Sequence, residues 1–306
     1  MLLTRNRNKY RFYIILNMKF AWSNVDKFED ADIIIVSVPD ESGSHSIRKS
    51  TSKAPNRIRQ VSNERDVFLR EGRKTLAMPE LNASNKKVFD YGNISKNEIG
   101  SVMKQIVSAG KIPIVIGGDH SITTKTVNAT SEAIDDVGVV YFDAHPDFIC
   151  SSKEYYGSVF CDISESINVN KSMQIGIRAP EPEEIENLKQ MKITVLTPLD
   201  VLDIGLRNVA DLVVKKMSSN VYISLDMDCI DPAFAPGVSV PVPAGLSSNE
   251  LIYLLKAIAN NGIIGMDLME VCPDYDINDS TSHLASRIIA EVISSIKLKK
   301  DVKAST

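Results

Sequence analysis

The chain has 306 residues, of which 43% are hydrophobic and 24% are charged, a balance that is typical of globular proteins and excludes an intrinsically disordered chain. The formal net charge of −4 excludes a broad basic surface for nucleic acid, and no apolar run approaches the roughly 20 residues that span a bilayer. We therefore expect no nucleic-acid partner and no membrane partner.

The first 19 residues have an unusual charge pattern. They include five basic residues and no acidic residue, and their one apolar run covers only residues 12–16. This run is shorter than the roughly 7–15 residues of a signal-peptide core, and no small-residue cleavage site follows it. We interpret residues 1–19 as a basic N-terminal extension of a cytoplasmic protein, with Met18 as an alternative start, and residues 20–306 as one α/β domain.

Short β-branched runs alternate with helical patterns along this domain. Strands are predicted at 33–38, 88–89, 112–116, 138–142, 173–177, 193–196, 221–225 and 263–268. Helices are predicted at 55–69, 99–109, 122–134, 181–191, 208–217, 248–260 and 281–296. Most of these strands are apolar on both faces, which is typical of a parallel sheet covered by helices on both sides. We predict a single-domain, three-layer αβα fold with a mostly parallel sheet of about eight strands.

The four cysteines form no C-x-x-C pair, so a zinc ribbon and a thioredoxin-type motif are excluded. They are Cys150, Cys161, Cys229 and Cys272. So few thiols in a chain of this length indicate a reducing compartment and no disulfide framework. We expect all four to be small, buried hydrophobic side chains.

Polar residues follow four of the predicted strands at the point where each strand ends. Residues 117–121 read GGDHS, residues 143–147 read DAHPD, residues 226–232 read DMDCIDP, and Met269 is followed by Glu270. The carboxyl ends of parallel strands share one edge of a sheet, and ligands of open α/β sheets bind at that edge. We therefore expect these four segments to meet at one site.

Within these segments, six metal-ligand residues are spaced so that they converge, because residues two apart in an extended segment point to the same side. They are His120, Asp143, His145, Asp147, Asp226 and Asp228. Four carboxylates and two imidazoles are too many for a tetrahedral zinc site. A single D-x-D or D-x-H pattern is usually a solvated loop, but three at the ends of buried-type strands favour two divalent ions with bridging carboxylates. Oxygen-rich ligation favours Mn²⁺.

These motifs resemble those of the ureohydrolase family, the group of arginases and agmatinases. GGDHS at 117–121, DAHPD at 143–147 and SLDMDCIDPAFAPG at 224–237 match its three metal-binding motifs, and MDLMEV at 266–271 is similar to its guanidinium-site motif. The similarity extends over residues 33–296. It implies an arginase-like fold, two Mn²⁺ per subunit, a small-molecule guanidino substrate and a homo-oligomer, either a trimer or a hexamer.

The resemblance also implies a role for each ligand. One Mn²⁺ would bind His120, Asp143, Asp147 and Asp226, and the other would bind His145, Asp143, Asp226 and Asp228, so that Asp143 and Asp226 bridge the two ions. Glu270 would accept hydrogen bonds from the substrate guanidinium, since a planar guanidinium pairs well with a carboxylate. The alternative for Glu270 is a surface acid after a strand.

The predicted reaction uses water activated by the metal pair, which lowers the pKa of a bridging water so that hydroxide attacks the guanidinium carbon. Asp147 would be the first proton acceptor, and collapse of the tetrahedral intermediate would release urea and an amine that needs a proton. Asp119 and Asp231 would orient ligands.

The chain departs from the family where a further histidine usually follows the DAHxD motif and carries a proton to the leaving amine. Residues 148–158 contain no histidine, and Tyr156 stands nearest to that position. Unperturbed tyrosine, with a pKa near 10, is a poor proton shuttle at neutral pH. His45 is the candidate substitute, against the alternative of a solvated loop histidine. We expect His283 to be a helix-packing residue.

Several functions fit these motifs. The shortened loop after DAHPD lacks an evident group for the carboxylate and amine of an amino acid, which favours agmatine, cleaved to putrescine and urea. Arginase, guanidinobutyrase and formimidoylglutamase activities stay open. An alternative from another class is a metal-binding family member that lacks catalysis and acts as a structural or regulatory subunit, because the usual histidine is absent.

Overall fold

The computed structural model describes residues 18–64, 69–70, 73–74, 86–217 and 219–298, so residues 1–17 of the predicted extension lie outside the described residues. The strands are β1 (Ile33–Ser37), β2 (Leu69–Arg70), β3 (Arg73–Lys74), β4 (Val88–Asn93), β5 (Ile112–Ile116), β6 (Val137–Phe142), β7 (Met173–Ile175), β8 (Thr194–Leu196), β9 (Asn220–Asp226) and β10 (Gly265–Met269). The α-helices are α2 (Ala54–Ser62), α4 (Ile99–Ser108), α5 (Ile122–Ser131), α6 (Val159–Ile163), α7 (Pro182–Met191), α8 (Pro198–Ile204), α9 (Leu206–Lys216), α10 (Ser248–Asn261) and α11 (Ser280–Ser295).

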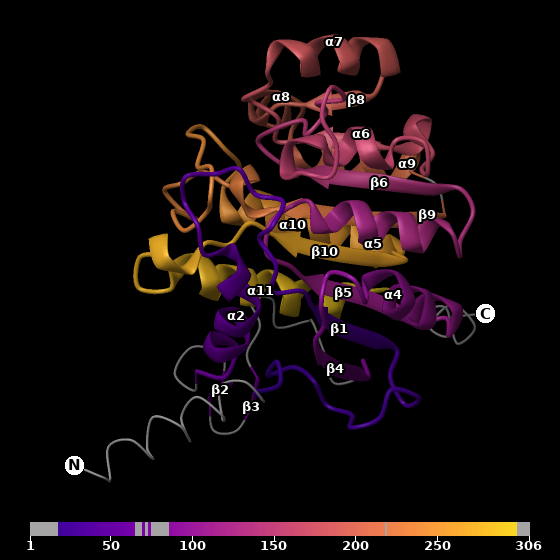
Figure 1. The fold of residues 1–306 in the computed structure, drawn as a ribbon, viewed down its shortest axis with the longest axis vertical. Coiled ribbons are helices and arrows are strands. Elements are labelled where there is room, and N and C mark those ends of the chain that lie inside the picture. Colours follow the sequence, from indigo (N-terminus) through magenta and orange to yellow (C-terminus); the bar gives the residue numbers. More distant parts are fainter. Residues whose placement is uncertain (1–17, 65–68, 71–72, 75–85, 218, 299–306) are drawn as a thin grey trace.

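One sheet organises the domain. Its eight strands follow the order β4-β1-β5-β10-β9-β6-β7-β8, and every neighbouring pair is parallel (Figure 1). β2 and β3 form a separate antiparallel pair. The predicted α/β fold with about eight strands is confirmed, since runs of apolar residues on both strand faces are what a doubly covered parallel sheet requires.

Side chains of each strand alternate between two cores. In β1, Ile33 and Ile35 pack into a cluster with residues of α2, α9, α10 and α11, whereas Ile34 and Val36 pack with residues of α4, α5 and α6. The same alternation holds in β6, where Val140 and Phe142 face the first cluster and Val139 and Tyr141 face the second. The helices therefore form a layer on each face of the sheet (Figure 1).

One predicted helix is too long. The apolar spacing predicts a helix over 55–69, but α2 ends at Ser62, and Leu69–Arg70 pairs with Arg73–Lys74. The residues after Ser62 read Asn-Glu-Arg-Asp and offer the helix face no apolar side chain to bury, and residues 65–68 of the predicted helix lie outside the described residues. The short helices α6 and α8 were not predicted.

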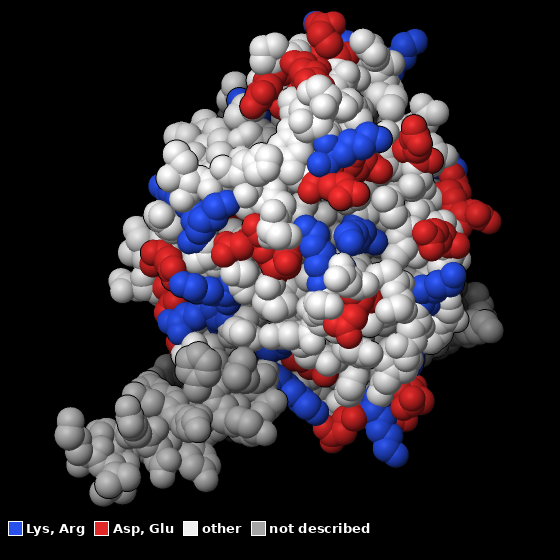
Figure 2. All heavy atoms as spheres, in the orientation of Figure 1, with Lys and Arg blue, Asp and Glu red and all other residues white. Residues whose placement is uncertain are grey.

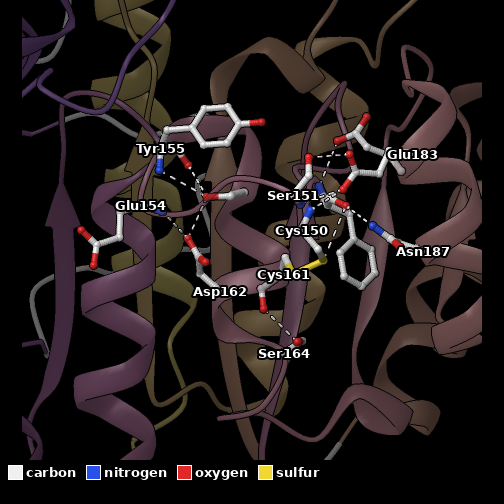
Figure 3. The surroundings of a disulfide bond; sticks show 12 residues. Cys150, Ser151, Glu154, Tyr155, Cys161, Asp162, Ser164, Glu183 and Asn187 are labelled. Atoms are coloured by element: carbon white, nitrogen blue, oxygen red, sulfur yellow. Dashed lines mark hydrogen bonds between the residues drawn. A yellow bond between two sulfur atoms is a disulfide. The ribbon is translucent and has the colours of Figure 1, made fainter.

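The expectation for the cysteines is wrong for two of the four. Cys229 and Cys272 are buried free thiols, as predicted, but Cys150 and Cys161 form a disulfide (Figure 3). Cys150 is exposed and Cys161 is half-buried, so neither is a buried hydrophobic side chain. Their separation of 11 residues belongs to no spacing motif, and only the folding of the loop between β6 and α6 brings them together.

The surface carries both signs of charge. Figure 2 shows Lys and Arg side chains interspersed with Asp and Glu side chains over the face in view. Within the described ranges of the chain, no helix is long and apolar enough to cross a membrane.

Candidate active site

The site lies where β5, β6, β9 and β10 end. These four strands are consecutive in the sheet, in the order β5-β10-β9-β6. The loops that follow β1 (indigo) and β9 (orange) lie together at the same side of the view in Figure 1. The end of β10 is tied to the loop after β5, because Glu270 N donates to Gly118 O over 2.9 Å. At Gly118 an added Cβ would lie 1.8 Å from Asp40 O, so only glycine allows this approach of two loops.

All six predicted ligands meet in two adjacent groups. His120 Nδ1 lies 3.0 Å from Asp143 Oδ2, 3.1 Å from Asp147 Oδ2 and 3.2 Å from Asp226 Oδ2. His145 Nδ1 lies 3.1 Å from Asp228 Oδ2 and 3.5 Å from Asp143 Oδ1. Asp143 thus belongs to both groups, one with His120 and Asp147 and one with His145 and Asp228, and each group is compact enough to hold a metal ion.

The electrostatics of this cluster fit a bound cation. Burial, together with the charge of Asp143, raises the pKa of Asp147 to about 7, and burial with neighbouring carboxylates also raises the pKa of Asp226 and Asp228. Burial opposes ionisation of Asp143 as well, but the adjacent imidazoles of His120 and His145 lower its pKa. Asp143 Oδ2 is buried and accepts no hydrogen bond. A divalent ion would give that oxygen a partner and remove the repulsion among the carboxylates.

The second nitrogen of His120 is held by a chain of buried hydrogen bonds. His120 Nε2 lies 3.0 Å from Ser224 Oγ, and Ser224 Oγ donates to Asp267 Oδ1 over 2.9 Å. Asp267 Oδ2 accepts from Thr126 Oγ1 and Tyr222 OH. This chain fixes the imidazole plane and gives Nε2 an acceptor for its proton, so that Nδ1 faces the carboxylates and is the nitrogen that would bind a metal ion.

Tyr141 is a site residue that the sequence analysis missed. Its hydroxyl donates to Asp147 Oδ2 over 2.6 Å and lies 3.2 Å from His120 Nδ1, and its ring stacks on the His120 ring at 4.9 Å. The available signal was a polar aromatic residue in an apolar strand, two positions before Asp143 and therefore on the same face. Tyr141 fixes the orientation of the Asp147 carboxylate.

Glu270 is a buried residue of the site and not a surface acid. Glu270 Oε1 accepts from His120 N over 2.7 Å, and Glu270 Oε2 accepts from Ser239 Oγ. Burial and the nearby charge of Asp119 raise the pKa of Glu270 to about 8. Glu270 has φ 67°, and Asp147 has φ 48°; both lie in the left-handed region, which is strained for residues other than glycine. Such strain is often found at functional positions.

The two acids predicted to orient ligands bind loop backbone. Asp119 Oδ2 accepts from Gly43 N over 2.8 Å, and Asp119 Oδ1 accepts from Ser121 N over 2.9 Å. Asp231 accepts from the backbone of Ala233 and Gly245. Asp119 therefore fixes the loop that carries His45, and Asp231 fixes the turn after β9.

His45 is exposed and lies against two tyrosines. Its ring stacks on Tyr155 at 5.0 Å and meets Tyr156 edge-on at 6.0 Å, and Tyr156 N donates to Gly43 O. The loop after β1 and the loop after DAHPD are thus joined at this aromatic group. His283 lies elsewhere, in α11, with its Nε2 3.1 Å from Glu64 Oε2.

The raised pKa values predict how stability depends on pH and metal. Protonated Asp147 and Glu270 stabilise the folded state at low pH, because their pKa values in the folded protein are raised to about 7 and about 8. This contribution to stability is lost as the pH rises through those values. The pKa of His145 is raised to about 12, so the folded state also loses stability from His145 as the pH rises above the pKa of an unfolded histidine. We expect the Tm of the metal-free protein to fall from about pH 6 to about pH 9. The gain in Tm on adding Mn²⁺ should grow over that interval, because metal displaces protons.

Thermal melts in EDTA and in excess Mn²⁺, at constant ionic strength, check this expectation. Mg²⁺ at the same concentration is the control for a general effect of divalent salt. A gain in Tm from Mn²⁺ that is constant or shrinks with rising pH contradicts the assignment of these groups to a cation site.

The Tyr141 contact predicts a specific loss of metal affinity. We expect Tyr141→Phe to weaken Mn²⁺ binding about 10–100-fold, as for other residues that orient a metal ligand, because the Asp147 carboxylate loses its buried donor. Tyr253→Phe is the control, since it removes an exposed tyrosine hydroxyl on α10 and not one from the hydrogen-bond chain that holds His120. Titration calorimetry that gives equal affinities for both variants would refute the role of Tyr141.

Comparison with known proteins agrees with the fold and the site. The Arginase family model matches residues 31–294. Proclavaminate amidinohydrolase from Streptomyces clavuligerus is 32% identical over 274 residues, and agmatinase from Proteus mirabilis is 30% identical over 282; each alignment covers 86% of this chain and 87% of the relative.

The solved structure of agmatine ureohydrolase from Thermoplasma volcanium has a TM-score of 0.80 at 28% identity and covers 97% of this chain and 99% of its own. The Trypanosoma cruzi formiminoglutamase structure also has a TM-score of 0.80, and at 20% identity it shows the common fold. The resemblance predicted from the motifs is therefore confirmed: the chain belongs to the arginase family and is an agmatinase-like ureohydrolase, a hydrolase that acts on the C–N bonds of linear amidines.

Proposed function

We propose that the protein is a binuclear Mn²⁺ enzyme that cleaves agmatine to putrescine and urea. The observation that carries the proposal is the pair of His/Asp groups that share Asp143 and lie beside the buried Glu270. The six predicted ligands would hold the two ions, and Asp143 belongs to both groups. A metal pair supplies, when bound, a water of low pKa and a positive charge near the developing negative charge of the reaction.

The residues of the chain then have distinct roles. Glu270 receives the guanidinium and holds its carbon in line with the nucleophile, because the backbone N–H of His120 and the hydroxyl of Ser239 fix both carboxylate oxygens. Asp147 takes the first proton, since the hydroxyl of Tyr141 holds its carboxylate in a fixed direction. The departing amine requires a second proton, and His45 is the candidate donor.

The surroundings of the aromatic group favour a substrate with a distal cation. Burial and the charges of Glu181, Asp147, Glu184 and Glu183 raise the pKa of Tyr155 to about 12. The side of the site formed by Tyr155 and Tyr156 therefore has a negative electrostatic potential. The ammonium of agmatine is attracted by such a field and by aromatic faces, whereas the carboxylate of arginine is repelled. Relatives named as agmatinases support the same choice.

Urea release from a panel of guanidino compounds tests the proposal. With Mn²⁺ bound, we expect kcat/KM for agmatine to exceed that for arginine and 4-guanidinobutyrate by at least about tenfold, a difference of about 1.4 kcal/mol. Glu270→Gln is the matched control and should lower kcat/KM about 10²–10³-fold, the usual loss for a group that stabilises transition-state charge. Absence of urea from every compound, with metal binding demonstrated, would instead favour the non-catalytic metal-binding member that the missing histidine suggests.

The role of His45 has its own test. We expect His45→Ala to lower kcat at least about 10²-fold, the lower end of the range for a lost general acid, and imidazole in the buffer to restore part of the rate. His283→Gln is the control, because His283 lies on α11 and pairs with Glu64 outside the site. Unchanged turnover of His45→Ala eliminates His45 as the proton donor.

Two further proposals concern assembly and location. The resemblance implies a homo-oligomer, a trimer or a hexamer, whereas the expected cytoplasmic location comes from the charge pattern of residues 1–19 and from the small number of cysteines. The Cys150–Cys161 disulfide is an observation against permanent reduction of all four thiols.

A further inference from the structure

The Cys150–Cys161 disulfide encloses the loop that borders the candidate site. Cys150 follows Asp147 by three residues, and Cys161 directly follows Phe160, whose N–H donates to Asp147 O over 2.8 Å. The bridge therefore joins the two chain segments that flank Asp147, one of the predicted metal ligands and the predicted proton acceptor. In Figure 3 the bridge lies beside the start of the loop, with Glu183 and Asn187 of α7 on the same side.

The residues between the two cysteines contact the opposite loop of the site. Tyr155 stacks on His45, Tyr156 N donates to Gly43 O, and the Tyr156 ring meets the His45 ring edge-on. A displacement of the loop at the disulfide would therefore move Tyr155 and Tyr156 relative to His45, with which they form one aromatic group. We call this group the aromatic wall.

The remaining contacts of the loop are polar and mostly exposed. Glu183 accepts hydrogen bonds from Cys150 N, Ser151 N and Ser151 Oγ, and Asp162 accepts from Glu154 N and Ser158 Oγ (Figure 3). Exposed hydrogen bonds compete with water and each contributes little net stability. The apolar cores beneath the loop do not include Cys150. Opening the bridge would thus loosen the loop while the sheet stays folded.

We infer that the Cys150–Cys161 disulfide is a redox-reactive site that holds the aromatic wall in its substrate-binding position. A dithiol reductant attacks the exposed Cys150 Sγ, breaks the S–S bond and releases the Cys161 thiolate, which takes a proton; the second thiol of the reductant then resolves the mixed disulfide. The protein gains two electrons and two protons as two thiols, and the reductant becomes a disulfide. Oxidation by a small-molecule disulfide reverses the step.

The reduced enzyme is expected to bind its substrate more weakly. The aromatic wall, with its negative electrostatic potential, is the part of the site proposed above to bind the distal cation of the substrate, so this expectation rests on the proposed function. Loosening the wall removes contacts to the part of the substrate that does not react, which raises KM more than it lowers kcat. Amide exchange in residues 151–158 does not depend on the substrate and reports the same loosening.

The experiment compares the native protein and the Cys150→Ser/Cys161→Ser double variant, each with and without dithiothreitol at a fixed excess of Mn²⁺. Alkylation followed by mass spectrometry verifies the state of the two thiols. In the native protein we expect reduction to raise the KM for agmatine by about threefold or more and to speed amide exchange in 151–158, and reoxidation to restore both. The double variant should resemble the reduced protein and ignore dithiothreitol, which also controls for chelation of Mn²⁺.

Two results overturn the inference. One is unchanged KM and unchanged exchange after alkylation has shown both thiols to be free; the other is a pair of thiols that stay free after treatment with oxidised glutathione. If no guanidino compound yields urea in either redox state, the proposed function fails, and the exchange of 151–158 alone decides whether the disulfide holds the loop.

Discussion

The convergence of buried carboxylates at one edge of the sheet is the constraint on which the rest of the site depends. Asp143, Asp147, Asp226 and Asp228 are nearly inaccessible to water, and this burial, together with their mutual repulsion, raises the pKa of Asp147, Asp226 and Asp228. Without a counter-charge such a cluster destabilises the fold, so the protein surrounds it with hydrogen-bond donors and imidazoles. The two histidines, the Tyr141 hydroxyl and the strained turn at Asp147 all serve to hold these oxygens in fixed directions.

The sheet explains why these residues could be recognised in the sequence. Continuous apolar strands predict a doubly covered parallel sheet, and the polar residues directly after 116, 142, 225 and 268 must then share its carboxyl edge. Spacing by two predicted extended segments, but Met227–Cys229 forms a 3₁₀ turn and Asp147 has φ 48°, so turns after the strands, and not extended backbone, bring these ligands together. Strand positions were predictable to within a few residues, whereas the end of α2 was not, because apolar spacing resumed by chance beyond a polar segment.

The parts that could not be predicted depend on contacts between segments far apart in the sequence. Ser224 and Asp267 lie on adjacent strands but 43 residues apart, and nothing in either segment alone identifies the chain of hydrogen bonds that they form with His120. The Cys150–Cys161 bridge is a similar case, since the expectation of reduced thiols came from their number and not from their place in the fold. Pattern and spacing identify the ligands, and packing determines how the ligands are held.

The position of β10 has a consequence for how the protein is made. This strand lies between β5 and β9 near the middle of the sheet, although it is the last strand among the described residues. During synthesis, β5 and β9 cannot both complete their ladders until residues 265–269 have left the ribosome, and Glu270 emerges directly after them. A nascent or truncated chain that stops before β10 holds the six ligand residues without their central strand and without the carboxylate beside them, so the complete site exists only once translation has passed Glu270.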